Sequence, residues 1–308
     1  MTVAQLIPVF AAAIGAATPL MLAGLGELVA ERTGVLNLGV EGMMLIGAIA
    51  GFACAVDSGL GAWAGLGAGA VAGALASLLF AVPALSLAAN QPACGLALTI
   101  FGVGFSAFVG QGYVSDSLPG MQPWAVPWLS ALPGAGPVLF RQAPVVYAAL
   151  LLFGAVWWVL ARTRTGLILR AVGESPESAH AIGYPVLLIR YGAVMFGGAM
   201  AGLGGAYLST VYTPLWAQNM TAGRGWIAIA LVVFASWKPG RLLIGAFLFG
   251  GVTILQFHAQ TLGWTVPVQL LAALPYLATV VVLVVISRDK RLLQLNLPAS
   301  LGKGFLPD

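Results

Sequence analysis

Residues 161–190 read ARTRTGLILRAVGESPESAHAIGYPVLLIR, a polar stretch with four arginines, two glutamates and a histidine in an otherwise apolar chain. Within it, Ser175 can cap a helix, Pro176 suits the first helical position, and Glu177 falls in the first turn, where the helix dipole favours negative charge. Gly183 then ends the helix, because glycine readily adopts the left-handed conformation there. The stretch therefore predicts one short polar helix held between two long apolar segments.

The composition of the whole chain indicates a membrane protein. Of its 308 residues 60% are hydrophobic and only 7% are charged, and the mean hydropathy is +0.98. Soluble domains carry roughly 25% charged residues. Apolar runs of about 20 residues, the length that crosses the hydrocarbon core, recur along the sequence. We therefore predict an all-α polytopic membrane protein with a single transmembrane domain over residues 1–308.

We predict about nine crossings, within a range of about eight to ten, from the length of the apolar runs. The predicted crossings are Ile7–Gly26, Val35–Val56, Gly61–Leu87, Cys94–Val114, Ala143–Leu160, Leu187–Tyr212, Gly225–Trp237, Leu242–Gln260 and Val266–Ser287. The seventh is short, which indicates a tilted, broken or re-entrant segment.

The orientation follows from the basic residues. If the loop Arg162–Arg190 is cytoplasmic, nine crossings place the N-terminus outside and the C-terminus in the cytoplasm. Only Arg141 and Arg224 of the 13 basic residues then lie outside, as the positive-inside rule requires. The same assignment places Glu27 and Glu31 at the cytoplasmic face.

The longest external segment, residues 115–142, contains five prolines, which exclude a regular helix through it. We expect Trp124 and Trp128 to lie at the membrane–water boundary. Two interpretations stay open: a lid on the membrane surface, or a docking surface for an external partner.

Small residues predict close helix packing. The third crossing carries Gly61, Gly65, Gly69 and Gly73 at every fourth position, which forms one smooth stripe on a helix. Gly198 and Gly202 make a similar stripe on the sixth crossing. Packing within the subunit is favoured over a subunit interface.

Glu41 and Asn37, in TGVLNLGVEGMMLIGA (Thr33–Ala48), are the candidate residues of a substrate pathway. An ionisable residue inside a crossing usually faces the protein interior or water. Glu41 could line the path or its gate. Alternatively, it could lie near the cytoplasmic rim, paired with Arg32 or capping a half-helix.

No motif predicts catalysis. The chain lacks a phosphate-binding G-x-x-x-x-G-K-[ST] loop, an H-E-x-x-H motif and a metal-ligand cluster, so we expect no enzyme activity, metal or cofactor. Its basic residues are dispersed over loops, which argues against nucleic-acid binding. An ion-coupled secondary transporter is the alternative, although only Glu41 is then left as a coupling carboxylate.

Four blocks of the sequence carry a resemblance that covers nearly the whole chain in order. The blocks are GELVAERTGVLNLGVEGMMLIGA (Gly26–Ala48), GLILRAVGESPESAHAIGYPVLLIRYGAVMFGGAMAGLGGAYLS (Gly166–Ser209), NMTAGRGWIAIALVVFASWKP (Asn219–Pro239) and PVQLLAALPYLATVVVL (Pro267–Leu283). They resemble permease subunits of bacterial ABC importers of the ribose/branched-chain amino acid class, closest to the branch for nucleoside and simple-sugar uptake.

The resemblance implies a role for the short polar helix. Glu177, Ala179 and Gly183 match the E-A-A-x-x-x-G loop of importer permeases, with Ser178 in place of the middle alanine. That loop holds the coupling helix, which contacts the ATPase. The residues assigned to it here are Gly173, Glu174, Ser175, Pro176, Glu177, Ala179 and Gly183. The resemblance also suggests that Asn219 and Trp226 border the pathway together with Asn37 and Glu41.

The resemblance further implies partners and a location. It implies a separate ABC ATPase subunit that binds ATP and Mg, a second permease that is often a different chain, and an extracytoplasmic solute-binding lipoprotein. The expected location is the bacterial cytoplasmic (inner) membrane, in contact with lipid. Members of the class usually have ten crossings, so this chain would lack the first.

Overall fold

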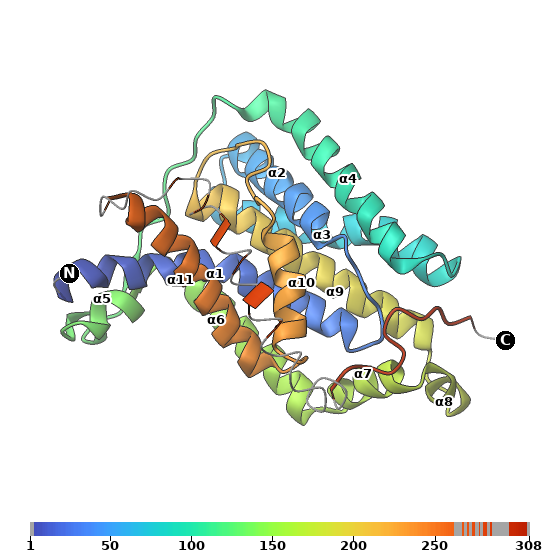
Figure 1. Cartoon of the computed structure of the whole chain (residues 1–308). Coiled ribbons are helices and arrows are strands. Elements are labelled where there is room, and N and C mark those ends of the chain that lie inside the picture. Colours follow the sequence, from blue (N-terminus) through green and yellow to red (C-terminus); the bar gives the residue numbers. More distant parts are fainter. Residues whose placement is uncertain are drawn as a thin grey trace.

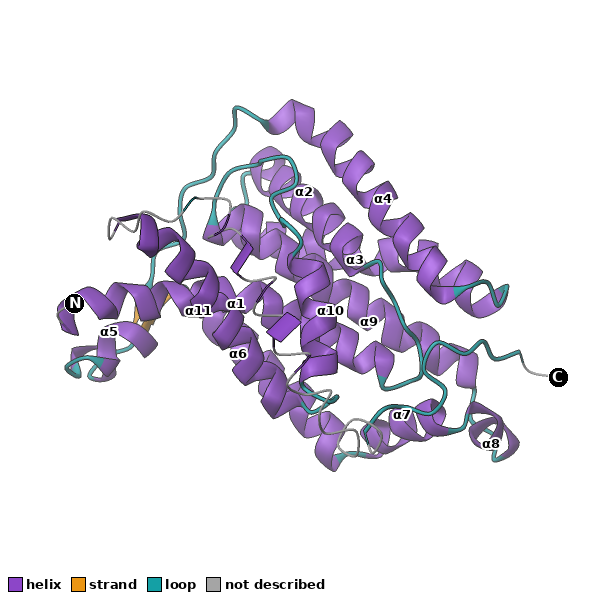
Figure 2. Cartoon of the chain, in the orientation of Figure 1, coloured by secondary structure: helices purple, strands orange, loops and turns teal. Residues whose placement is uncertain are grey.

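The computed structural model describes residues 3–261 and 296–306, together with isolated positions between 267 and 284. This part of the chain is mainly helical (Figure 2), and seven of its helices are long and apolar enough to cross a membrane. The long helices are α1 (Val3–Glu31), α2 (Val40–Ser58), α3 (Ala62–Ala81), α4 (Gln91–Gly110), α6 (Pro144–Arg162), α9 (Val186–Tyr207) and α11 (Pro239–Thr261). Single turns of π-helix, η1 (Val82–Ser86) and η4 (Leu208–Tyr212), extend α3 and α9.

Three shorter helices complete the bundle: α7 (Arg164–Glu174), α8 (Pro176–Ala181) and α10 (Arg224–Phe234). The short seventh crossing that we predicted corresponds to α10, which has only 11 residues. The second crossing starts at Val40 and not at Val35, because residues 33–39 form turns and extended chain. Most of the ninth predicted crossing, Val266–Ser287, lies outside the described residues, as does most of the fourth sequence block.

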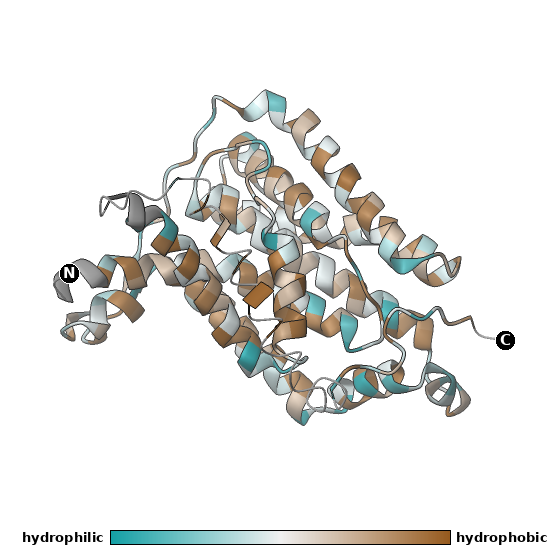
Figure 3. Ribbon diagram, in the orientation of Figure 1, coloured by the Kyte–Doolittle hydropathy of each residue, from teal (hydrophilic) through white to brown (hydrophobic). Residues whose placement is uncertain are grey.

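The buried centre of the bundle is formed by α1, α2 and α9. In Figure 1, α1 runs through the middle of the molecule, and α9 and α11 pack along it. On the outer helices, large apolar side chains point away from the protein: Ile100 is 74% exposed, Phe108 75% and Leu151 76%. Figure 3 shows hydrophobic residues, in brown, recurring along the ribbons of α4 and α6. Such a surface is stable only when hydrocarbon covers it.

The two glycine stripes predicted from the sequence face each other. A Cβ built on Gly73 would lie 2.8 Å from the Cα of Gly202, and one built on Gly69 would lie 3.1 Å from the Gly202 carbonyl oxygen. Gly65 likewise approaches Gly51 of α2. Gly61 was predicted to pack with them, but it lies before α3 with φ +76° and open space around it. It permits a turn rather than a helix contact.

Opposite ends of the bundle carry the two polar regions. At one end, Gln142 Nε2 donates a hydrogen bond to the carbonyl of Ala11 in α1 (3.1 Å). There the segment 115–142 forms a small two-stranded sheet, β1 (Trp124–Ala125) with β2 (Arg141–Gln142), and the five-residue helix α5 (Ala135–Leu139). At the other end lie α7, α8 and residues 296–306 (Figure 1).

Three ionisable residues that we assigned to the cytoplasmic side are buried inside the bundle. Glu27 is 1% exposed, and Glu31 and Arg190 are 0% exposed. The cause is that α1 continues to Glu31 and the following loop folds back over its end. Glu27 accepts a hydrogen bond from the backbone N–H of Asn37 (3.2 Å).

Candidate functional site

The N-terminus of α10 lies against Glu41 in the first turn of α2. Glu41 Oε1 accepts hydrogen bonds from the Thr221 hydroxyl (2.5 Å) and the Gly223 N–H (2.9 Å), and Oε2 accepts one from the Gly225 N–H (2.6 Å). The carboxylate is only 3% exposed. It satisfies backbone donors that the start of a helix leaves free, and its charge is favourable at the positive end of the helix dipole.

The glycine-rich sequence before α10 makes this close approach possible. Asn219, Ala222 and Gly223 have φ of +56°, +46° and +78°, so the chain turns through left-handed conformations into the helix. A Cβ on Gly225 would lie 2.5 Å from both the Cα and the N of Glu41. Only glycine therefore lets the two backbones meet here.

The other end of α10 is held by Glu31, the last residue of α1, and by Arg32, which follows α1. Arg32 donates from Nη2 to the Trp237 carbonyl (2.7 Å), and the Trp237 indole N–H donates to Glu31 Oε2 (2.5 Å). Burial lowers the pKa of the Arg32 guanidinium, and nearby Arg170 adds to this effect, while Glu174 opposes it. A cation at the C-terminal end of a helix complements its dipole.

These contacts make α10 a half-helix with its start inside the bundle. Eleven residues span about 16 Å, roughly half of the 30 Å hydrocarbon core. Since the C-terminal end lies beside Glu31 and Arg32, where the 29-residue α1 ends, the N-terminal end lies near the middle of α1, beside the first turn of α2. Of the two roles open for Glu41, the geometry is that of a cap on a half-helix; its carboxylate does not pair with Arg32.

Asn37 is buried and stabilises the turn that leads into α2. Its side-chain oxygen accepts a hydrogen bond from the Gly39 N–H (2.8 Å), and the side chain is 1% exposed. This short local bond turns the chain into the helix.

The predicted pathway residues thus divide into two groups. Asn37 and Glu41 are buried, whereas Asn219 is exposed and Trp226 is 36% exposed. Glu41 and the segment 219–226 meet at the start of α10, and Asn37 lies beside Glu27 instead. Sequence reasoning missed Thr221, Gly223 and Gly225 as partners of Glu41. The sequence feature that could have indicated them is the glycine-containing run T-A-G-R-G, residues 221–225, within the block Asn219–Pro239.

The predicted coupling helix is α8, and its ends are built as expected. Ser175 Oγ accepts a hydrogen bond from the Ser178 N–H (3.2 Å), which caps the start. At the other end, the Gly183 N–H donates to the His180 carbonyl (2.8 Å) and the Tyr184 N–H to the Ala179 carbonyl (3.0 Å). Gly183 has φ +93°, so these bonds form a Schellman motif.

Only some of the residues predicted for the coupling helix are exposed to a partner protein. Glu174, Glu177 and Gly183 are exposed, and Ile182 beside them is 73% exposed. Gly173, Pro176 and Ala179 are buried within the chain, so they are not exposed to a partner protein. Gly173 instead lies against the backbone of Arg32.

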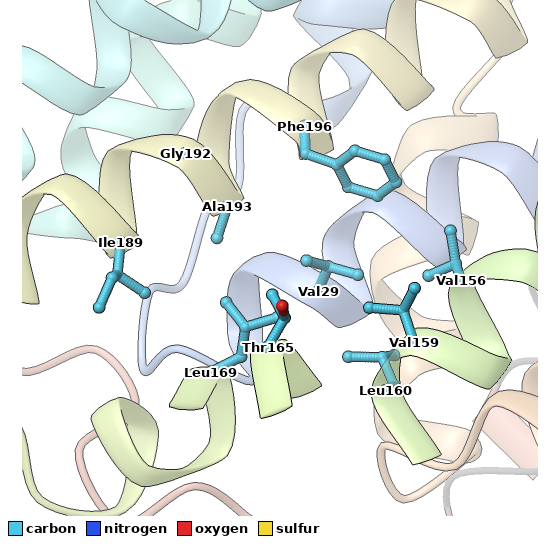
Figure 4. A pocket seen from close by; sticks show the side chains of 10 residues that line it. All are labelled: Val29, Val156, Val159, Leu160, Thr165, Leu169, Ile189, Gly192, Ala193 and Phe196. Carbon is cyan, nitrogen blue, oxygen red and sulfur yellow. The ribbon is translucent and has the colours of Figure 1, made fainter. Parts of the chain in front are cut away.

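A cavity of about 390 Å³ lies between α1, α6, α7 and α9 (Figure 4). Its lining is apolar, and Thr165 supplies the only side-chain hydroxyl among the ten residues that line it. A site that binds a polar solute requires several convergent hydrogen-bonding groups. This cavity therefore does not have the composition of a solute site.

Comparison with known proteins places the chain in a transport family. The family described as branched-chain amino acid transport system / permease component matches residues 9–286. A protein of Haloferax volcanii provisionally named a glucose ABC transporter permease is 44% identical over 294 residues, which cover 88% of this chain and 89% of the relative. A guanosine ABC transporter permease of Bacillus subtilis is 33% identical over 285 residues, covering 87% and 88%.

A nucleoside ABC transporter permease of Lactococcus lactis is 30% identical over 278 residues, covering 86% of this chain and 88% of the relative. These relatives match the branch suggested by the four sequence blocks. They also decide against the ion-coupled transporter, which was the alternative. The chain belongs to the branched-chain amino acid transport system / permease component family and is a permease component of an ABC transporter.

Proposed function

We propose that this chain forms one half of the translocation pathway of an ATP-driven importer for a small, uncharged, polar solute, a nucleoside or a simple sugar. The observation that supports it best is the half-helix α10, whose N-terminus is occupied by Glu41. In secondary transporters, interrupted helices that start near the bilayer midplane border the substrate site, and we infer the same use of the half-helix here. The relatives named for glucose, guanosine and nucleosides support the same solute class.

The occupied N-terminus supports an uncharged solute. A free helix start attracts carboxylates and phosphates, because its N–H groups and its dipole both favour an anion. Here the N–H groups of Gly223 and Gly225 already donate to a carboxylate of this chain. An anionic solute would compete with that carboxylate, while the hydroxyl groups of a sugar or nucleoside need no net charge.

The energy would come from a separate ATPase that binds ATP and Mg and contacts the exposed side of α8. Glu177 and Ile182 present a charged and an apolar group on that side. The other partners in this proposal are a second permease chain and an extracytoplasmic solute-binding lipoprotein. The proposed location is the cytoplasmic membrane, with the α8 end of the bundle on the cytoplasmic side and the N-terminus outside.

The test is uptake by the complete importer in proteoliposomes, with ATP inside and the binding protein outside. Labelled glucose, guanosine and a branched-chain amino acid are compared. We expect ATP-dependent uptake of the sugar or the nucleoside that an ionophore does not abolish. Uptake of the amino acid alone would contradict the solute class, and uptake that requires an ion gradient would contradict ATP-driven import.

The contact with the ATPase has its own test. Glu177→Arg reverses the exposed charge of α8, and Lys303→Ala changes a nearby exposed side chain as a control. We expect Glu177→Arg to abolish uptake although the protein still inserts in the membrane. Normal ATP-dependent uptake by this variant would refute α8 as the contact.

A further inference from the structure

The guanidinium of Arg190, at the start of α9, is completely buried. It donates from Nε to the Thr33 carbonyl (3.1 Å), from Nη1 to the Lys303 carbonyl (3.2 Å) and from Nη2 to the Ser300 hydroxyl (3.2 Å). These three acceptors are neutral oxygens on two segments far apart in the sequence. Burying a cation is costly unless its donors are satisfied. The hydrogen bonds of Arg190 therefore hold two stretches of backbone together, and the charge of Glu177 also acts on its guanidinium.

One of these stretches is the C-terminal segment, residues Asn296–Leu306, which crosses the end of the bundle beside α7, α8 and α9 (Figure 1). The Ser300 N–H and hydroxyl both donate to the Gly173 carbonyl at the end of α7 (3.0 and 2.7 Å). The Gly302 N–H donates to the Gly34 carbonyl in the loop between α1 and α2 (3.0 Å). The C-terminal segment thus joins the α7–α8 region to the α1–α2 loop.

The C-terminal segment also covers the inner side of α8. Phe305 is 8% exposed and packs in a cluster with Val172, Ala179 and Val186. Its ring lies edge-on to His180, with ring centroids 5.7 Å apart. The buried side of α8 therefore rests partly on Phe305, and α8 cannot shift without disturbing this contact.

The α1–α2 loop, which contacts the C-terminal segment at Gly34, leads from there to α2 and its contact with α10. Two residues after Gly34, the Leu36 N–H donates to the Gln91 side chain (2.9 Å). The Asn37 side chain then accepts from the Gly39 N–H just before α2 begins. Glu41 in the first turn of α2 then holds the N-terminus of α10. A continuous series of hydrogen bonds and packed side chains connects α8 with the half-helix.

We propose that the C-terminal segment and Arg190 are positioning elements, which hold α8 in register with the α1–α2 loop so that a displacement of α8 by the ATPase reaches α10. This inference rests on the proposed function, because it takes α8 as the ATPase contact. It assigns residues 296–306 to energy transmission.

The test measures solute taken up per ATP hydrolysed by the complete importer in proteoliposomes. Phe305→Ala removes the side chain that supports α8, and Ser300→Ala removes the hydroxyl shared by Gly173 and Arg190. The matched controls are Leu306→Ala, an exposed apolar neighbour, and Lys303→Ala, which keeps the carbonyl that accepts from Arg190. We expect the ratio to fall about fivefold or more in the two test variants, as coupling energies of about 1–3 kcal/mol imply, and to stay normal in the controls.

The ratio separates positioning from a structural role, because a smaller amount of folded importer lowers uptake and hydrolysis together. Phe305→Leu, which keeps an apolar side chain, should restore most of the ratio. A normal ratio in both Phe305→Ala and Ser300→Ala would overturn the inference. If Glu177→Arg abolished uptake while these ratios were normal, only this inference would fail. If Glu177→Arg left uptake normal, the proposed ATPase contact itself would fail.

Discussion

Replacing Glu41 by glutamine tests whether the start of α10 depends on a carboxylate. The substitution keeps the size of the side chain, but one oxygen becomes an NH₂ group. If the remaining oxygen stays with Thr221 and Gly223, the NH₂ faces the Gly225 N–H, which loses its acceptor. In the flipped orientation, Thr221 and Gly223 lose theirs.

The magnitude follows from these contacts. A hydrogen bond to a charged group contributes about 1.5–3 kcal/mol, and a charge at a buried helix end adds up to about 2 kcal/mol. Since at least one such bond and the charge are lost, we expect a loss of about 2–4 kcal/mol in the free energy of unfolding. One kcal/mol shifts the melting temperature of a protein of 150–250 residues by about 2–4 °C, and by less in a longer chain such as this one, so we expect a fall of roughly a few degrees.

The assay is thermal unfolding of the purified protein in detergent, followed by tryptophan fluorescence, together with uptake by the reconstituted importer. Glu177→Gln is the matched control, because that carboxylate is exposed. We expect Glu41→Gln to unfold at a lower temperature and to transport poorly, and the control to unfold normally. An unchanged melting temperature and normal uptake for Glu41→Gln would refute the capping role.

Three further predictions concern other parts of the bundle. Gly69→Leu should cost about 3 kcal/mol or more, because α3 meets α9 there, whereas Gly67→Leu has open space and should unfold normally; equal melting temperatures would contradict the packing. Trp237→Phe removes the indole donor to buried Glu31 and should cost about 1–3 kcal/mol in thermal unfolding, while Trp158→Phe, at a 62% exposed position, should not. Gly183→Val forces a β-branched residue into φ +93° at a cost of about 1–3 kcal/mol and should reduce uptake. Gly183→Asn should retain most of the uptake, since asparagine tolerates that conformation, and equal uptake by the two variants would speak against the Schellman end of α8.

The sequence predicted the parts of the fold that depend on local patterns. Apolar runs located the long helices among the described residues, and the four-residue spacing of Gly65, Gly69 and Gly73 located a close helix contact. Ser175, Pro176 and Gly183 located both ends of α8, because caps and left-handed glycines act within a few residues. The family resemblance added the transport class, which the relatives support.

What the sequence could not show depends on contacts between distant segments. Glu41 and Gly225 are 184 positions apart, and nothing local to either residue indicates that their backbones meet. The burial of Glu27, Glu31 and Arg190 has the same cause, since charge counting assigns such residues to a face by default. Ala179 was assigned to the coupling helix because it matches the E-A-A-x-x-x-G loop, whereas in the structure Phe305, far along the chain, packs against it.

The contact between the two glycine stripes limits how this bundle can move. Where Gly73 and Gly202 touch, α3 and α9 meet backbone against backbone, and a slide of one residue along either axis would drive a larger side chain into that contact. We therefore expect α3 and α9 to move together as one rigid unit. Each of them ends in a single π-helical turn, η1 or η4, where the regular hydrogen-bond ladder is interrupted. Bending at these two turns would let the pair of helices tilt while the contact between Gly73 and Gly202 is kept.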